Sequence, residues 1–233
     1  MRVSVIIPVF NEEKSIPYVL NDIPNFVSQI IVCDNSSTDK TSEIAKKLGA
    51  EVVFEKEKGY GNACLKAISY LKNLKVKPEV VVFIDGDYSD DPQQMKKIID
   101  PIVNQGYDFV SGARTKSLRD KHSMTAQQIF GNQLACFLMK IFFNSKFRDL
   151  GPFRAITWDK LMELNMRDKT FGWTIEMQIK VLMKNYKYKE IDVKYKKRIG
   201  KSKISGTLKG TILAGKKILY LIFKYYLKKK IGI

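Results

Sequence analysis

The sequence predicts an α/β protein with a mostly parallel sheet and helices on both of its faces. Three observations lead to this fold class. Short runs rich in Val and Ile, typical of buried strands, alternate with amphipathic stretches between Val3 and Ser111. The spacing of these runs is that of βα units, which build parallel sheets. Polar side chains follow several of the runs directly, and open α/β sheets place their ligand crevice at this end of the strands.

The individual elements follow from local patterns. Val3 to Val9 is an unbroken apolar run and forms the first strand. A helix follows, because Ile16, Val19 and Ile23 fall on one helical face. Gly49 is a suitable C-cap for the second helix. In chain order we expect strands at residues 3–9, 30–33, 51–54, 80–84 and 107–111, and helices at residues 12–23, 38–48, 61–74 and 92–104.

Length and composition are those of a globular chain with one large domain and an appendage. The chain has 233 residues, of which 45% are hydrophobic and 28% are charged. Met1-Arg2 leads directly into the first strand without a signal sequence, and no window has the roughly 18 uncharged apolar residues that span a bilayer. We therefore expect a cytoplasmic protein. Cys33, Cys64 and Cys136 lack metal-binding spacing and are expected to be reduced, and the single histidine, His122, supports neither a metal cluster nor a Ser-His-Asp triad.

The formal net charge of +17 is concentrated toward the C-terminus. From Lys184 onward, 16 Lys or Arg residues stand against two acids, a net +14. A local basic surface of this kind suits nucleic acid, an anionic membrane or a phosphorylated substrate.

Residues 206–230 have the pattern of an amphipathic helix. At about 100° per residue, five lysines fall within a stripe of roughly 120°, and apolar residues occupy much of the remaining circumference. The lysines are Lys209, Lys216, Lys217, Lys224 and Lys228, and the apolar residues are Ile212, Leu213, Leu219, Leu221, Ile222, Phe223, Tyr226 and Leu227. This pattern favours a helix at a membrane interface, with Tyr220, Tyr225 and Tyr226 near the headgroups. A helix packed on the core of the protein, or in a dimer, has the same pattern.

Two acids separated by one glycine, Asp85-Gly86-Asp87, follow the fourth strand. Carboxylates at the end of a buried parallel strand project into the ligand crevice. A hard divalent cation such as Mg²⁺ or Mn²⁺, carrying a diphosphate, suits them. The alternative is a solvated acidic turn before the helix that Pro92 begins.

Other strand ends carry polar or glycine residues as well. They are Pro8, Asn11 and Glu12 after the first strand, Asp34, Asn35, Ser36 and Asp39 after the second, and Lys58, Gly59 and Gly61 after the third. Any one of these residues can serve as a helix cap or turn residue. With Asp85 and Asp87 after the fourth strand, four strand ends carry polar or glycine residues, which is hard to explain by capping alone.

Three segments resemble the opening signatures of family 2 glycosyltransferases, which have the Rossmann-like GT-A fold. They are Val3 to Glu13, Val32 to Asp39 and Asp85-Gly86-Asp87. The resemblance continues through residues 112–114, 149–154, 171–176 and 198–203, so it covers essentially the whole chain. The sequence is most similar to the synthases of polyprenyl or dolichyl phosphate mannose and glucose.

The resemblance implies a nucleotide-sugar donor, either UDP-glucose or GDP-mannose in type. Pro8 and Glu12 would border the nucleoside, and Asp34 would accept a hydrogen bond from the base. Gly59 and Gly61 would let the backbone approach the donor. The full implied donor set is Pro8, Glu12, Asp34, Lys58, Gly59, Gly61, Asp85 and Gly86.

The resemblance also implies a divalent metal, with Asp87 as its first ligand and Asp85 as its second. In the mannosyl synthases a glutamine two residues beyond the second Asp helps to bind the metal, and Ser89 stands there in this chain. Ser89, Asp90, Asp91 or a water would take its place.

The implied reaction is an inverting displacement at the anomeric carbon with a nucleoside diphosphate as leaving group. A divalent ion and nearby cations stabilise the charge that develops on the diphosphate. Arg198 and Lys203 are suited to that role, and Arg114 and Arg154 to holding an acceptor phosphate by bidentate contacts. The alternative for all four is an ordinary surface cation.

Glu176 distinguishes two variants of the mechanism. A hydroxyl acceptor needs a general base, which a carboxylate can supply, whereas a lipid phosphate already carries an anionic oxygen. Glu176 also stands in the first turn of a predicted helix that follows Gly172-Trp173, where an acid is stabilised by the helix dipole. The sequence leaves both roles open.

A further helix is predicted over residues 123–143. Its apolar side consists of Ile129, Phe130, Leu134, Phe137, Leu138 and Ile141. We expect this helix to cover the acceptor half of the crevice, where its apolar side either shelters a prenyl chain or packs on the sheet.

We therefore expect a catalytic domain over residues 1–205 and a basic amphipathic helix over residues 206–233. The expected function is hexose transfer from a nucleotide sugar to a polyprenyl or dolichyl phosphate at the cytoplasmic face of a membrane. The alternatives are transfer to a hydroxyl of a glycolipid, polysaccharide or soluble acceptor, and nucleic-acid binding by the basic tail, which leaves the acids at the strand ends unexplained. Deletion of residues 206–233 is expected to release the protein from membranes and to leave donor binding intact.

Overall fold

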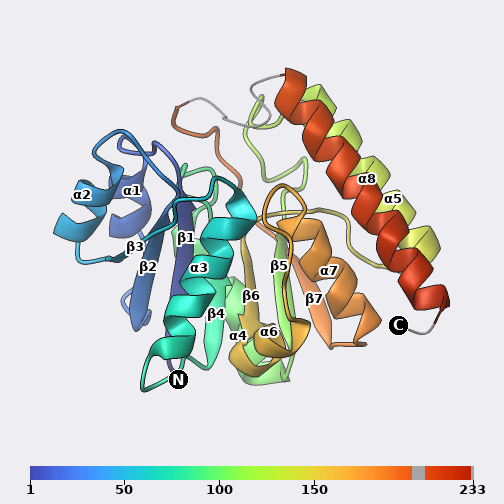
Figure 1. Cartoon of the computed structure of the whole chain (residues 1–233), viewed down its shortest axis with the longest axis horizontal. Helices are drawn as coiled ribbons and strands as arrows, with labels where there is room; N and C mark the ends of the chain where they lie inside the picture. Colours follow the sequence, from blue (N-terminus) through green and yellow to red (C-terminus); the bar gives the residue numbers. More distant parts are fainter. Residues whose placement is uncertain (201–207, 232–233) are drawn as a thin grey trace.

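The computed structural model of the chain describes residues 1–200 and 208–231. Its strands are β1 (Val3–Val9), β2 (Gln29–Asp34), β3 (Glu51–Phe54), β4 (Val80–Phe83), β5 (Phe109–Ala113), β6 (Arg154–Thr157) and β7 (Tyr188–Asp192). They form one sheet in the order β3-β2-β1-β4-β6-β5-β7 (Figure 1). All neighbouring pairs are parallel except the two that involve β6. The mostly parallel sheet predicted from the sequence is confirmed.

Helices cover both faces of the sheet (Figure 1). One face carries α1 (Ile16–Asn21), α2 (Thr41–Lys47) and α4 (Met95–Gln105), the last preceded by the 3₁₀ turn η1 (Pro92–Gln94). The other face carries α3 (Tyr60–Asn73), α6 (Trp158–Leu164) and α7 (Trp173–Met183). Two longer helices, α5 (Ala126–Phe143) and α8 (Leu208–Lys230), lie side by side along one flank. Successive side chains of β1 enter opposite cores, as Ile6 and Ile7 do, because side chains alternate along a strand.

The predicted elements agree with the structure over most of the first 113 residues. β1 and β3 have the predicted bounds, and α1 begins later than predicted because residues 12–15 form a turn in which Ile16 N donates to Glu12 O. The sequence did not indicate β6, α6 or β7. β6 has four residues and takes its place between β4 and β5 only through long-range pairing.

The apolar side predicted for helix α5 is not the side that packs inward. Ala135, Cys136, Met139 and Phe143 are buried, whereas Phe130, Phe137 and Ile141 are exposed. The helix is apolar on most of its circumference, so periodicity alone could not select the buried side. Of the apolar side chains expected over the crevice, Phe130, Phe137 and Ile141 therefore face solvent, whereas Ile129, Leu134 and Leu138 are partly buried.

Helix α8 contacts α5 and α7 and contributes Leu221, Ile222 and Tyr225 to the buried core. Tyr225, which we expected near a membrane surface, is among the buried residues, while Tyr220 is exposed. The proposed domain boundary at residue 205 falls among residues that the structure does not describe. Within the described ranges, no helix is long and apolar enough to cross a membrane.

Gly61 is a position at which the fold leaves no room for a side chain. An added Cβ would lie 2.0 Å from the Asp168 carbonyl oxygen, because the start of α3 abuts the chain at residues 168–169. We expect Gly61→Ala to lower the free energy of unfolding by about 1–3 kcal/mol, the cost of overpacking. Urea unfolding followed by circular dichroism measures this change.

Gly131→Ala in α5 is the matched control, since a Cβ there meets nothing within 4 Å. Alanine is the better helix former, so this variant should be about as stable as the wild type or up to about 1 kcal/mol more stable. Equal unfolding midpoints for the two variants would contradict the close contact at Gly61.

Candidate functional site

A cavity of about 380 Å³ opens where β1 and β4 end. Eight of the residues predicted for the site line it: Pro8, Glu12, Lys58, Gly59, Asp85, Gly86, Asp87 and Arg198. Val9, Phe10, Asn35, Tyr60, Ala63, Thr170 and Phe171 complete its wall. The structure therefore brings together most of the expected donor-binding residues, which come from segments far apart in the sequence.

The two acids after β4 lie on the floor of this cavity. Asp87 is buried, and Asp85 is partly buried and accepts a hydrogen bond of 3.0 Å from the Tyr60 hydroxyl. Burial, and then the negative charge of Asp87, raise the pKa of Asp85 to about 7. A cation held between these two carboxylates and a ligand would offset the cost of ionising Asp85.

Arg198 joins the two halves of the chain across the cavity. Its guanidinium contacts Glu12 Oε1 at 3.0 Å and Asp87 Oδ2 at 3.2 Å. The backbone of the same segment is fixed nearby, since Ile199 N donates to Asp87 O. Arg198 thus neutralises acids from two strand ends and lies where an anionic leaving group would be bound. Lys203, predicted for the same role, lies outside the described residues.

Asn35 and Gly59 shape the side of the cavity next to β2. Asn35 Oδ1 accepts a hydrogen bond of 2.6 Å from Gly59 N, and Asn35 Nδ2 donates to Glu57 O at 2.7 Å. Gly59 has φ +146°, which side chains rarely adopt, and a Cβ there would lie 2.2 Å from Lys169 O. The sequence placed Asn35 at a strand end without assigning it a role. Its position directly after Asp34 and before the glycine pair was the available signal.

Asp34 and Gly61, both expected to contact the donor, do not line this cavity. Both carboxylate oxygens of the buried Asp34 accept hydrogen bonds from its own loop and helix, from Ser37 N and the Ser42 hydroxyl, and Asp34 is not part of the cavity wall. Gly61 permits a close approach of backbone, but the approaching chain is that of Asp168 and not a donor. These two residues therefore shape the site from behind its wall.

Glu176 does not reach the cavity either. It is 1% exposed, and its carboxylate accepts hydrogen bonds from the backbone N–H groups of Arg167 and Asp168 and from the Tyr225 hydroxyl. Lys180 pairs with it at 2.7 Å. Of the two roles left open by the sequence, the contacts favour the structural one, because every one of them holds the chain around α7 in place.

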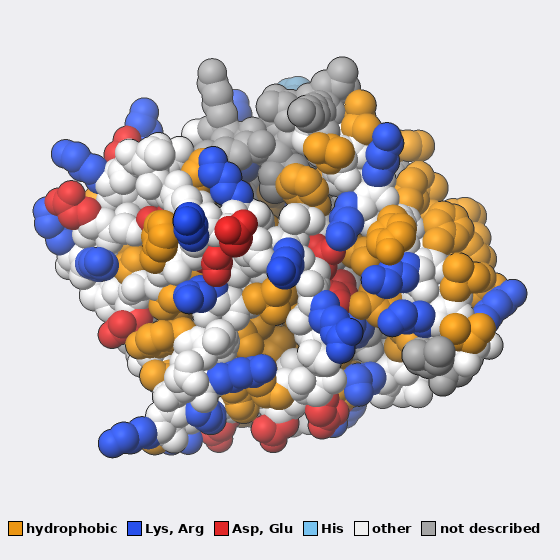
Figure 2. All heavy atoms as spheres, in the orientation of Figure 1, with side chains coloured by type: hydrophobic (Ala, Val, Ile, Leu, Met, Phe, Trp, Pro, Cys, Tyr) orange, Lys and Arg blue, Asp and Glu red, His pale blue; other side chains and the backbone are white. Residues whose placement is uncertain are grey.

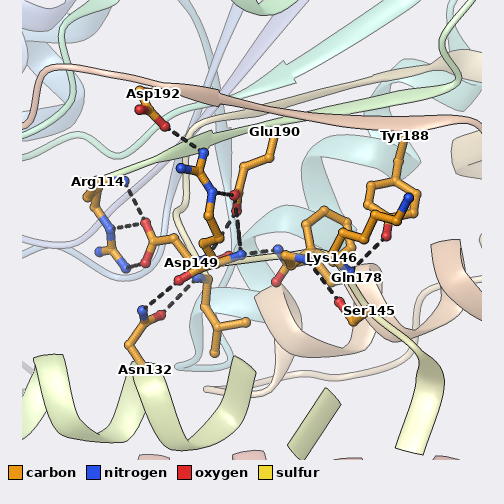
Figure 3. Close-up of polar contacts among 12 residues, drawn as sticks. Arg114, Asn132, Ser145, Lys146, Asp149, Gln178, Tyr188, Glu190 and Asp192 are labelled. Carbon is orange, nitrogen blue, oxygen red and sulfur yellow. Dashed lines mark hydrogen bonds and ion pairs between the residues drawn. The ribbon is translucent and has the colours of Figure 1, made fainter. Parts of the chain in front are cut away.

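Arg114 is held by a buried carboxylate at the end of β5. Its Nε and Nη2 donate to Asp149 at 2.7 and 2.9 Å (Figure 3). Burial raises the pKa of Asp149, but the charge and hydrogen bonds of Arg114 outweigh burial and hold that pKa below its usual range. The loop that carries Asp149 and Leu150 is also hydrogen-bonded to two helices (Figure 3). Asn132 of α5 accepts a hydrogen bond from Leu150 N, and Gln178 of α7 donates one to Asp149 O.

A second cavity, of about 490 Å³, lies beside Arg114. Four cationic residues line it: Arg114, Lys116, Arg119 and Arg148. Tyr195, over whose ring the Arg114 guanidinium lies at 5.1 Å, begins the segment that continues to Arg198 in the first cavity. The second cavity therefore offers positive charge, and the chain segment from Tyr195 to Arg198 connects it with the first cavity.

Arg154, expected to share a phosphate with Arg114, is instead in the core. It is fully buried, and its guanidinium donates to the carbonyl oxygens of Gly151 and Thr174. Burial lowers its pKa to about 10, against the opposing effect of Tyr60 and of nearby acids that include Asp85. β6 places Arg154 beside the last residue of β4, so its charge lies beneath the acid pair.

The residues present fit a divalent cation that is held jointly by protein and ligand. Among the described residues, no three acids, histidines or cysteines are close enough to hold a metal by themselves. Asp85 and Asp87 supply two carboxylates, and the two oxygens of the buried Asp90 have no hydrogen-bond partner. Mg²⁺ usually keeps waters and takes one or two carboxylates together with substrate phosphates. Ser89, at the position of the missing glutamine, donates its hydroxyl to Asp87.

Comparisons with known proteins agree with this geometry. Residues 4–164 match the family model described as glycosyl transferase family 2. An uncharacterized glycosyltransferase of Mycobacterium tuberculosis is 32% identical over 213 residues, which are 91% of this chain and 94% of the relative. A dolichyl-phosphate hexose transferase of Haloferax volcanii is 31% identical over 220 residues, which are 93% and 92% of the two chains.

A similar solved structure is that of glucosyl-3-phosphoglycerate synthase from Mycobacterium tuberculosis in complex with Mn²⁺, UDP and phosphoglyceric acid. Its TM-score is 0.76 at 19% identity, over 97% of this chain and 78% of that one. This likeness shows a shared GT-A fold. The family model covers more than half of the chain, and relatives above 30% identity align with nearly all of it. We conclude that this chain belongs to glycosyltransferase family 2.

Proposed function

We propose that this protein transfers a hexose from a nucleotide sugar to a polyprenyl or dolichyl phosphate, at the cytoplasmic face of a membrane and with Mg²⁺ or Mn²⁺. The observation that carries the choice of acceptor is the position of Glu176. The carboxylate that the sequence offered as a general base is buried and engaged by four donors. A lipid phosphate brings its own anionic oxygen, so it needs no base.

The donor half of the proposal rests on the first cavity. Asp85 and Asp87 would hold the cation, which when bound neutralises charge that develops on the departing diphosphate. Arg198 and Lys58 line the same cavity and add positive charge there. A dolichyl-phosphate hexose transferase and a UDP-N-acetylglucosamine–dolichyl-phosphate N-acetylglucosaminyltransferase are among the relatives, and a similar solved structure is named for UDP-glucose, which supports the substrate class.

The proposed binding site for the acceptor phosphate is the second cavity. Arg114 is fixed by Asp149 and can present its remaining guanidinium edge to a phosphate, with Lys116 and Arg119 alongside. Arg154 is left out of this contact, because its donors are bound to backbone oxygens in the core. An anionic oxygen bound at Arg114 would lie on the side of the donor cavity bounded by the segment between Tyr195 and Arg198.

The proposed membrane contact is an exposed apolar band formed jointly by α5 and α8. In Figure 2, apolar and basic side chains gather over this flank of the molecule. The large apolar residues that are exposed on the two helices are Phe130, Phe137, Ile141, Ile212, Leu213, Tyr220, Phe223 and Leu227. Lysines interspersed with such residues suit an anionic lipid surface.

Asp87→Asn should abolish hexose transfer, because a neutral amide cannot hold the cation that the diphosphate requires. Purified protein is incubated with labelled UDP- and GDP-sugars, Mg²⁺ or Mn²⁺, and either polyprenyl phosphate or soluble acceptors. Label that moves into the organic phase with the wild type, and not with the variant, is the expected result.

The control is Asp100→Asn, which removes an exposed acid on α4 that pairs with Lys96. It should transfer sugar at the wild-type rate. Label found only in soluble acceptors would refute the lipid acceptor, and native activity in Asp87→Asn would refute the metal site.

Glu176→Gln should slow the reaction by about tenfold or less and leave the shape of the pH–rate profile unchanged. The amide can still accept from Arg167 N and Asp168 N, and the loss is of a charged hydrogen bond and an ion pair. Removal of a general base costs about 100-fold or more. Steady-state rates measured across the pH range distinguish the structural role of Glu176 from the role of a general base. A loss of several hundredfold in a folded variant would indicate the base role, and with it a hydroxyl acceptor.

Phe137→Glu should weaken vesicle binding by about tenfold or more, because burial of a phenylalanine contributes about 1.5–3 kcal/mol. Co-sedimentation with phosphatidylcholine–phosphatidylglycerol vesicles measures the change. Phe54→Glu is the control, since Phe54 on β3 is equally exposed, at 59%, but lies outside the band. If both variants sediment like the wild type, the band is not the membrane contact.

A further inference from the structure

One wall of the donor cavity is a short connection between α6 and α7, residues 167–172, here called the wall loop. Thr170 and Phe171 line the cavity directly. On one side the wall loop is joined to the start of α3, where Asn62 N donates to Lys169 O at 2.9 Å. Its position therefore sets the shape of the donor site.

A buried carboxylate organises the wall loop from within. Asp168 Oδ1 accepts hydrogen bonds of 2.9 Å from both Thr170 N and Gly172 N. The other oxygen, Oδ2, pairs with Lys217 of α8 at 2.8 Å, and the side chain of Asp168 is 2% exposed. The charge that shapes the wall loop is thus neutralised by a residue of the C-terminal helix.

A second contact from α8 supports the base of the wall loop. The Tyr225 hydroxyl donates to Glu176 Oε1 at 2.8 Å, and Glu176 accepts from the backbone N–H groups of Arg167 and Asp168. Leu221 packs between these two contacts, since a Cβ on Gly172 would lie 2.2 Å from its Cδ1 atom.

The three residues of α8 that reach the wall loop are spaced four apart, at positions 217, 221 and 225, so they form one stripe of the helix. Tyr220, Phe223 and Leu227 are exposed beside this stripe. One helix therefore carries both the exposed apolar band and the contacts that hold the donor site.

We infer that Lys217 and Tyr225 are positioning residues for nucleotide-sugar binding, which act through Asp168 and Glu176 on the wall loop. The inference rests on the donor site of the proposed function and not on its acceptor. It also reverses an expectation from the sequence, that removal of residues 206–233 leaves donor binding intact. Loss of α8 would remove Lys217 from Asp168 and Tyr225 from Glu176, and would loosen the wall loop.

The test uses the full chain with the variants Lys217→Met and Tyr225→Phe. UDP and GDP, each with Mn²⁺, are the binding probes in calorimetry, and hydrogen–deuterium exchange reports on the backbone of the wall loop. We expect the dissociation constant of the nucleotide that binds to rise by about tenfold, the effect of losing one hydrogen bond to a charged group. Exchange should accelerate at residues 168–172 and stay unchanged in the strands.

Matched controls separate positioning from a general loss of stability. Lys217→Arg keeps the charge and should restore both readouts. Lys216→Met removes the exposed neighbouring lysine, and Tyr226→Phe removes a hydroxyl next to Tyr225, so both should behave as the wild type.

Unchanged exchange in the wall loop would overturn the inference, as would acceleration spread over the whole chain. Exchange needs no ligand, so it tests the contacts of the wall loop separately from binding, and faster exchange with an unchanged dissociation constant would also overturn the inference. Failure of both nucleotides to bind the wild type would instead refute the proposed donor.

Discussion

The burial of two carboxylates at the end of β4 is the constraint on which the rest of the site depends. Burial, and then the negative charge of Asp87, raise the pKa of Asp85 and so make its ionised form costly. Groups from distant segments stabilise the two carboxylates, because Tyr60 donates a hydrogen bond to Asp85 and Arg198 pairs with Asp87. Arg154 adds a buried positive charge from below. A site that must concentrate negative charge to bind a cation is stable only within such a frame.

The same solution recurs around the site, where buried acids are neutralised by bases brought from elsewhere in the fold. Asp149 is paired with Arg114, and Asp168 with Lys217. Removal of Arg114 would cost about 3–5 kcal/mol, because the buried charge of Asp149 is left without compensation, and removal of Lys217, whose side chain is 35% exposed, would cost less. The pairs therefore tie the loop of residues 145–151 and the wall loop to the helices and strands around them. Helix α8 is consequently part of the catalytic unit, although its composition resembles that of a separate basic tail.

The two flank helices show where periodicity is informative and where it is not. In α8 the lysines and the apolar residues recur with a helical period, which predicts an amphipathic helix. Leu221, Ile222 and Tyr225 of this helix are buried, whereas Tyr220, Phe223 and Leu227 are exposed. In α5 nearly every side is apolar, and three of the six apolar residues expected over the crevice, Phe130, Phe137 and Ile141, are exposed. Only the position of its neighbours determines which side of such a helix is buried. The resulting band exposes large apolar side chains interspersed with lysines, which is the reason to assign it a lipid surface.

The sequence by itself determined the parallel βα core, the acid pair after β4 and the family, because each depends on local runs and short motifs that keep their meaning in isolation. It also identified eight residues of the cavity wall. The tertiary structure alone decided that β6 runs antiparallel to its neighbours and that Arg154 and Glu176 are buried. It also decided that Asp34 accepts a hydrogen bond from its own loop and that α8 contacts the wall loop through Lys217. Apart from the hydrogen bonds of Asp34, these features depend on contacts between residues tens of positions apart. A carboxylate or guanidinium has the same chemistry in any sequence, and only the neighbours that folding brings to it decide whether it binds a ligand or supports the groups that do.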